Sequence, residues 1–220
     1  MTAPLAGRLC TIYAGGTPTV MTTEPAAWTT NYTVARITEA AKRAIDPATT
    51  VAVFVDAFEI SSGDYSVNFA EGTITFTDDQ GNLAVTVTSK YVPLLAVSQA
   101  KSVDIQLPAP VLADVTLLGD TAPRQLAVAQ KCSLSLAHFH QMSDDLDTGE
   151  GTLLLSTLLS GAPIFVEVKV STLQTLRGWF MPTKADWKHG LDSALEGTLE
   201  LTGVVQTCVG RSDQALFSLT

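Results

Sequence analysis

Alternation between apolar and polar positions is the strongest pattern in the first half of the chain. It runs through residues 65–70, 73–77 and 85–88. Successive side chains of a strand point to opposite faces, so each run offers one apolar face to a core. Glu71-Gly72 and residues 78–82 separate the runs, and their glycines and asparagine tolerate positive φ. The pattern predicts a three-stranded meander.

Further strands are predicted on both sides of this meander. The apolar residues 51–55 precede it and indicate a more buried strand. A second group of candidate strands follows Pro93, at residues 111–118, 132–140, 164–170, 173–181 and 195–202. Many short strands joined by turns are typical of a β-sandwich or a barrel. The expected fold class is therefore mainly β.

Two helices are predicted between these strands. The first spans about residues 38–44 and ends before Asp46-Pro47, since the residue before a proline disfavours helix. The second follows Asp147, which can cap it together with Glu150. Five leucines then cluster at helical positions from residue 153 to residue 159, before Gly161 and Pro163. We expect this leucine-rich helix to flank the strands.

The segment of residues 93–110 contains prolines and small polar residues, which predicts a linker or loop. A division of the 220 residues follows from it. Residues 1–95 would form an N-terminal meander region with a short helix, and residues 96–220 would hold the later strands and the leucine-rich helix. The alternative is one continuous domain.

Composition places the chain among proteins that are made in a cytoplasm. No apolar run approaches the roughly 20 residues that a membrane helix needs. The start of the chain lacks the charged and apolar regions of a secretion signal. Cys10, Cys132 and Cys208 are odd in number and far apart, which favours buried reduced thiols over disulfides.

The net charge of −9 and the pI of about 4.6 oppose a surface that grips nucleic acid, because phosphate binding needs clustered Lys and Arg. The same acidity is compatible with a surface that DNA slides past, since a negative wall repels phosphate. A simpler alternative is that the charge keeps the protein soluble.

Candidate chemistry is sparse. His138 and His140 lie two apart on a predicted strand, which is the spacing of a metal-binding pair in cupin-like β enzymes. The acidic residues 143–151 lack the ligand spacing of a calcium loop. No nucleophile elbow, phosphate-binding loop or zinc-protease motif is present. We therefore nominate no catalytic, cofactor-binding or metal-binding residue, and we expect neither a cofactor nor an enzyme.

Two stretches resemble tail tube (major tail) proteins of long-tailed bacteriophages. Residues 51–91 look like a meander common in phage structural proteins, and residues 177–184 with 195–201 are similar to the closing strands of tail tube proteins. The resemblance implies a β-sandwich or barrel with a helix at its side. It also implies hexameric rings of identical subunits, stacked into a tube with an acidic wall through which phage DNA passes without specific binding.

By this resemblance the partners are other copies of the chain and other tail proteins, with no membrane. The location is the virion tail, after assembly in the host cytoplasm. Three alternatives remain open at this point. One is another virion component, such as a head decoration or neck protein. The second is the metal-dependent enzyme with His138 and His140. The third is a carbohydrate-binding module that uses Trp28, Trp179 or Trp187.

Overall fold

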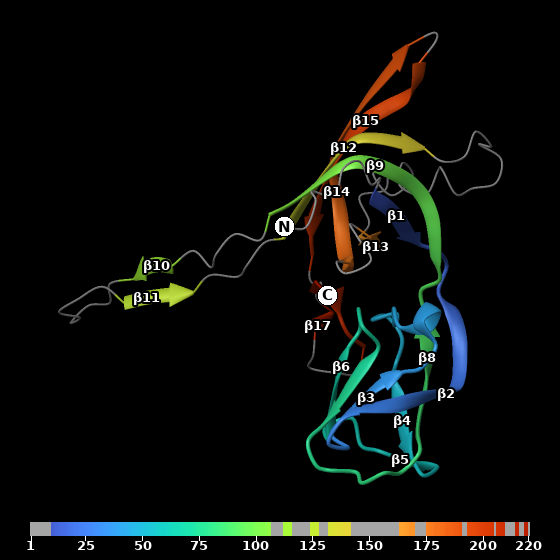
Figure 1. The fold of residues 1–220 in the computed structure, drawn as a ribbon. Helices are drawn as coiled ribbons and strands as arrows, with labels where there is room; N and C mark the ends of the chain where they lie inside the picture. Colours follow the sequence, from blue (N-terminus) through green and yellow to red (C-terminus); the bar gives the residue numbers. More distant parts are fainter. Residues whose placement is uncertain are drawn as a thin grey trace, which may run out of the picture.

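Two large antiparallel sheets, one above the other in Figure 1, make up most of the chain. The computed structural model describes residues 10–106, 112–115, 124–127, 132–141, 163–169, 175–190, 193–204, 206–209, 214–215 and 218–219. The expectation of a mainly β chain is confirmed. The upper sheet is a barrel, and the lower sheet is a module inserted into it.

The barrel consists of six strands whose pairing closes into a ring. In ring order they are β1 (Cys10–Gly15), β9 (Leu94–Gln106), β12 (Ser133–Gln141), β15 (Ser193–Gly203), β14 (Thr175–Gly190) and β13 (Ile164–Lys169). β13 pairs with both β14 and β1, which closes the ring, and β18 (Ser218–Leu219) pairs with β14 outside it. Long β14 meets β13 with its first half and β15 with its second.

Apolar side chains gather in the barrel core. They come from five of the six strands or from residues next to them, and the fully buried ones include Ile12, Leu134, Val166, Leu176, Phe180 and Leu201. A ring of so few strands leaves an interior just wide enough for side chains. In the part of the barrel that the structure describes, the interior is therefore an apolar core filled by side chains.

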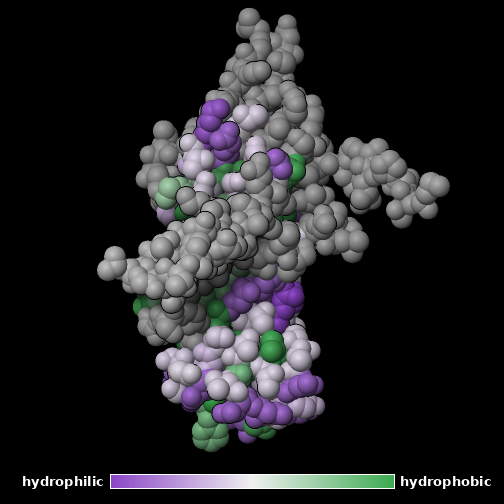
Figure 2. All heavy atoms as spheres, turned by 90° about the vertical axis from the view of Figure 1, so that its left-hand side faces the viewer, coloured by the Kyte–Doolittle hydropathy of each residue, from purple (hydrophilic) through white to green (hydrophobic). Residues whose placement is uncertain are grey.

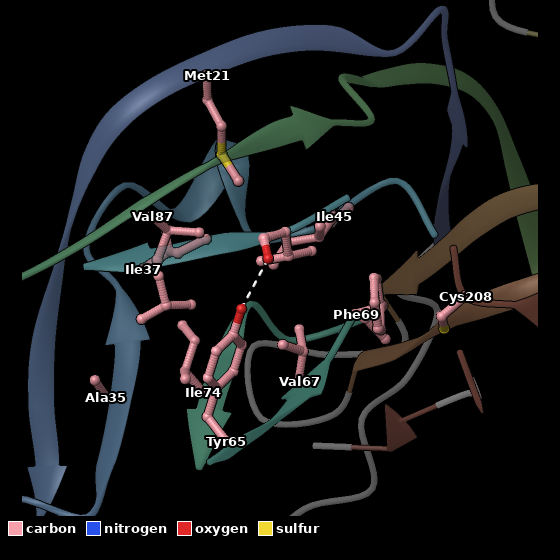
Figure 3. Packing of buried hydrophobic residues seen from close by; sticks show 14 of the residues in the cluster. Met21, Ala35, Ile37, Ile45, Tyr65, Val67, Phe69, Ile74, Val87 and Cys208 are labelled. Atoms are coloured by element: carbon pink, nitrogen blue, oxygen red, sulfur yellow. Dashed lines mark hydrogen bonds between the residues drawn. The ribbon is translucent and has the colours of Figure 1, made fainter. Parts of the chain in front are cut away.

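The inserted module, residues 19–91, forms the second sheet. Its elements are β2 (Thr19–Thr30), β3 (Val34–Ile37), the 3₁₀ helix η1 (Ala40–Lys42), β4 (Ala52–Val55), β5 (Phe58–Glu59), β6 (Tyr65–Asn68), β7 (Thr73–Phe76) and β8 (Val85–Tyr91). The sheet curls around a core of buried side chains (Figure 3), in which the Tyr65 hydroxyl donates a hydrogen bond of 2.8 Å to the Val51 carbonyl. The predicted buried strand at residues 51–55 is confirmed.

The module enters the barrel between two neighbouring strands, β1 and β9. The two connecting segments run side by side, and the Gly16 N–H donates a 2.8 Å hydrogen bond to the Pro93 carbonyl. A Cβ atom at Gly15 would lie only 2.5 Å from Val92 Cγ1, so glycine permits this close approach. β1 thus belongs to the same sheet as the strands after residue 93. The expected domain division at residue 95 stays a prediction.

Two small hairpins complete the described structure. β10 (Leu112–Val115) pairs with β11 (Arg124–Ala127), and β16 (Gln206–Thr207) pairs with β17 (Gln214–Ala215). In Figure 1 the β10–β11 hairpin lies far to one side of both large sheets. It forms a separate two-stranded sheet.

The prediction of a linker over residues 93–110 is wrong for most of that segment. β9 occupies Leu94–Gln106 and is hydrogen-bonded along both edges, to β1 and to β12. Its small and polar residues suggested a loop. A strand that is paired on both sides can nevertheless carry polar side chains, because its backbone groups are satisfied by its neighbours.

The predicted N-terminal helix over residues 38–44 is also wrong. Only one 3₁₀ turn forms, at Ala40–Lys42. The next backbone groups bond elsewhere: the Ile45 N–H donates to the Phe69 carbonyl at 2.8 Å, and the Ala44 carbonyl accepts from the Val92 N–H at 2.7 Å. These tertiary bonds replace those that a longer helix would need.

No helix in the described part of the chain is long and apolar enough to cross a membrane. The predicted leucine-rich helix at residues 147–160 lies outside the described residues.

The predicted meander is correct in its strands and partly wrong in their pairing. β6 and β7 form the expected hairpin, with φ of +61° at Gly72 in its turn. β8 instead pairs with β2 and β4, on the other side of the β2–β3 hairpin. Residues 77–84 make this crossing, held by a 3.1 Å hydrogen bond from the Gln80 N–H to the Tyr32 carbonyl. Alternation defines a strand's faces but does not name its neighbours.

The β4–β5 turn gives a first testable prediction. Asp56 and Ala57 have φ of +48° and +68°, a conformation that costs a residue with a Cβ roughly 1 kcal/mol. Relief of this strain in Ala57→Gly should raise the free energy of unfolding by about 0.5–1 kcal/mol. The extra conformational entropy that glycine gives the unfolded chain reduces this gain. Chemical denaturation measures this change. Ala84→Gly, at an exposed position without positive φ, is the control and should be neutral or destabilising.

Candidate functional site

The junction between barrel and module is built by the two barrel strands β13 and β14. Alternate residues of each strand point in opposite directions. Val166 and Leu176 lie in the barrel core, whereas Phe165 and Trp179 pack into the core of the module. The rings of Phe165 and Trp179 meet edge to face, with centroids 4.8 Å apart. β13 and β14 are thus covered on both faces where they pair.

Charged side chains lie beside these aromatic rings. Glu167 on β13 is 2% exposed, and Glu71, in the β6–β7 turn of the module, is 5% exposed. Arg177 on β14 connects them: its Nη2 lies 2.6 Å from Glu167 Oε2, and its Nε lies 3.6 Å from Glu71 Oε1. Arg177 Nη1 also donates to the Ala70 carbonyl at 3.5 Å. One guanidinium therefore joins the barrel to the module.

The ionic network continues outward at both ends. Arg36 on β3 pairs with Glu71 Oε2 and donates from Nε to the Glu71 carbonyl at 3.3 Å. At the other end, Lys169 Nζ lies 3.2 Å from Glu167 Oε1 and 4.5 Å from the centre of the Tyr13 ring. Each buried carboxylate thus has two cationic partners, as burial of a charge requires.

Arg43 lies near this network but is bonded to backbone. Its Nε donates to the Ile37 carbonyl at 2.9 Å. Burial lowers the pKa of Arg43 below its ordinary value, and the guanidinium groups of Arg36 and Arg177 lower it further. The neighbouring Gly72 is required here, because a Cβ would lie 2.8 Å from the Arg43 backbone.

The ionic network fixes the orientation of the module relative to the barrel. Arg177 Nε and Glu71 Oε1 have no hydrogen-bond partner among the described residues and are held by charge alone. Burying such groups brings little net stability, but separating them leaves a charge without its counter-ion. Arg177, Glu167 and Glu71 therefore select one position of the module relative to the barrel. They do not form an acid–base pair facing an open pocket.

A cleft of about 260 Å³ opens beside the junction, next to Trp179 and the Gly15-Gly16 connection. The carboxylate in its lining, Asp46, already accepts hydrogen bonds from the Ala48 N–H at 3.0 Å and the Thr49 hydroxyl at 2.8 Å. Its remaining lining is largely apolar or glycine. These lining residues do not provide the groups of a catalytic or anion-binding site.

The structure places the residues of the metal hypothesis only in part. His138 and His140 are on β12, where the pairing with β15 shifts register between Leu136 and Phe139. Their side chains lie outside the described part. Within that part, no group of three His, Cys, Asp or Glu residues converges on one point. The metal hypothesis therefore stays untested.

The cysteines and tryptophans of the sequence analysis are placed as follows. Cys132 and Cys208 are buried and form no disulfide, and burial raises the pKa of Cys132. Trp179 is buried at the junction, which removes it as a sugar-stacking platform. Trp28 is partly buried, and its indole N–H donates to the Leu83 carbonyl at 2.8 Å.

Comparison with known proteins gives a limited result. No protein-family model matches the chain, and no curated protein shows significant similarity. Two solved structures are similar over 56% of this chain, each with a TM-score of 0.37. One is the tail of an empty gene transfer agent (GTA) particle with C6 symmetry, at 17% identity and 86% of that chain. The other is the virion of a native GTA particle, at 19% identity and 88% of that chain. This similarity does not assign the chain to a family.

The sequence analysis missed the ionic network, although a signal was present. Phe165 and Glu167 share one face of β13, and Trp179 and Arg177 lie directly opposite them on β14. An aromatic pair beside a pair of opposite charges is a strong cross-strand match. It predicts both the pairing and a shared environment.

Proposed function

We propose that this chain is a non-enzymatic, structural virion protein. Its copies assemble into stacked rings that form a phage tail tube, and phage DNA passes through the tube. In this proposal the channel lies between the subunits, since side chains fill the barrel core. The protein would be assembled in the host cytoplasm and would contact itself and other tail proteins.

The β10–β11 hairpin is the observation that carries this proposal. A hairpin of two short strands is marginally stable at best in water on its own. Here it forms its own sheet, and Figure 1 shows it far from the barrel and the module. A neighbouring subunit that packs against it would supply further stabilising contacts.

The charge of the chain supports the same function. With a net charge of −9, copies packed in a ring would present an acidic wall to DNA. Repulsion between that wall and phosphate would prevent DNA from sticking during passage. The close coupling of module and barrel through Arg177 would give every subunit in a ring the same shape.

Negative-stain microscopy and light scattering at rising protein concentration test assembly. We expect rings or stacked tubes from the intact chain. A variant in which a short Gly-Ser linker replaces β10, β11 and the residues between them should keep the strand signal in circular dichroism and remain monomeric. The loss of assembly follows from the removal of the contact that joins neighbours.

Val20→Ser, at an exposed site on β2, is the matched control and should assemble normally. A chain that stays monomeric under all conditions would contradict the proposal. Closed rings that never stack would favour a head decoration or neck protein instead. Bound transition metal in elemental analysis, with loss of stability on chelation, would favour the enzyme with His138 and His140.

A further inference from the structure

We propose that the free end of the inserted module is a docking surface for another protein, one that carries Lys or Arg side chains around an apolar pocket. This free end, here the distal tip, consists of the turns at residues 30–33 and 55–58 and the loop at residues 77–84. In Figure 1 it is the end of the module that points away from the barrel. The proposal does not depend on ring assembly.

The distal tip is a single connected surface. The Asp56 N–H donates to the Ala84 carbonyl at 2.9 Å, which joins the β4–β5 turn to the loop. The Gln80 N–H donates to the Tyr32 carbonyl at 3.1 Å, which joins the loop to the β2–β3 turn. These bonds fix the three segments relative to one another, so a partner would meet a preformed surface.

Large apolar side chains are exposed on this surface. Phe58 is 75% exposed, Leu83 is 46% exposed and Tyr32 is 41% exposed. They are three of the five large hydrophobic residues that are exposed in the described part of the chain. Figure 2 shows hydrophobic and hydrophilic side chains next to each other at this lower end of the molecule. Apolar groups that gather on one surface indicate an interaction site.

The backbone holds two of these side chains outward at a cost. Four of the five described non-glycine residues with positive φ lie at the distal tip, namely Asn31, Tyr32, Asp56 and Ala57. Two-residue turns of this kind favour Asn-Gly or Asp-Gly. Tyr32 stands where glycine would be less strained, and Ala57 directly precedes Phe58. Strain that persists at a surface turn is typical of functional sites.

The charges of the distal tip determine the kind of partner. Its exposed carboxylates are those of Asp56, Asp78 and Asp79, and the exposed Glu59 directly follows the turn at residues 55–58. Residues 26–33, 52–66 and 73–89 contain no Lys or Arg. The basic residues of the module are Arg36, Lys42, Arg43 and Lys90, all outside these segments. An apolar surface within an all-acidic rim fits a basic protein surface and repels an anionic one.

Peptide binding tests the proposal with defined probes. Three fluorescent peptides of equal length alternate Lys with Leu, Glu with Leu, and Lys with Ser. We expect the Lys-Leu peptide to bind the full chain about tenfold more tightly than the other two, with affinity that falls as salt rises. Hydrogen exchange should slow in the turns at residues 30–33 and 55–58 and in the loop at residues 77–84.

Variants locate the binding. Phe58→Ser combined with Leu83→Ser, and separately Asp78→Asn combined with Asp79→Asn, should each weaken Lys-Leu binding about tenfold. Val20→Ser, at an exposed site near the barrel, should leave the affinity unchanged. Unchanged melting temperatures would confirm that all variants are folded.

Three results would overturn the proposal. The first is equal affinity for the three peptides. The second is Lys-Leu binding that the distal-tip variants leave intact. The third is that these variants abolish self-association of the chain without affecting the peptide, which would make a second copy the occupant.

Discussion

Arg177→Met is expected to lower the free energy of unfolding by about 3–5 kcal/mol. Arg177 is the group that pairs with Glu167 at 2.6 Å and faces Glu71 at 3.6 Å. Methionine keeps the unbranched apolar part of the side chain, so the main loss is the counter-ion of two buried carboxylates. Urea denaturation followed by tryptophan fluorescence measures the change, because Trp179 lies beside the network.

Lys184→Met is the matched control, because Lys184 lies 4.0 Å from Glu200 with both side chains more than half exposed. An exposed ion pair of this kind contributes at most about 1 kcal/mol. Arg177→Met combined with Glu167→Gln should cost less than the sum of the single changes, since the second change removes a carboxylate that the first leaves unpaired. Strict additivity would mean that the two side chains do not interact.

Phe69→Ala is expected to cost about 3–5 kcal/mol, as is usual for a fully buried phenylalanine. Phe69 is 1% exposed. It belongs to the same buried cluster as Phe165 and Trp179, on barrel strands β13 and β14, and Cys208. Figure 3 shows its ring next to Cys208. The cavity would open where module and barrel meet, so both parts should lose stability.

Phe58→Ala makes the same chemical change at a ring that is 75% exposed, and it should alter the free energy of unfolding by less than about 0.5 kcal/mol. Equal effects of Phe69→Ala and Phe58→Ala would contradict the described core. If Phe69→Ala splits unfolding into two transitions, the module and the barrel unfold as separate domains. That outcome would support an inserted domain of residues 19–91, with β1 belonging to the barrel.

The strands were predictable where one face is buried and the other is not. Val51, Val53 and Val55, like Tyr65 and Val67, alternate with less buried residues, so period two was visible in the sequence. Pairing was less predictable, because alternation carries no information on which edges meet. The alternation therefore predicted that β8 pairs with β7, whereas in the structure β8 pairs with β2 and β4. Residues 38–44 failed as a helix because Ile45 and Ala44 bond to distant segments.

The junction was harder to predict than the strands. Glu71 and Arg177 are far apart in sequence, and a charged residue is normally expected at the surface. Glu167 is buried because the module covers the outer face of β13, and that contact depends on the whole topology. The distal tip was not predicted for a different reason. Phe58 follows Asp56 and Ala57, which have positive φ, and the sequence has no glycine there to indicate such a turn.

The side-by-side entry and exit of the module have a consequence for engineering. β1 and β9 are adjacent antiparallel strands, with Gly15 opposite Leu94. A short turn could join them directly, and a foreign domain whose ends lie close together could replace residues 19–91 without stretching the barrel, provided that Phe165 and Trp179, which the module covers, are changed to polar residues. The barrel is therefore a natural scaffold for display, in which a fluorescent protein or an antigen would be carried by every copy of the chain.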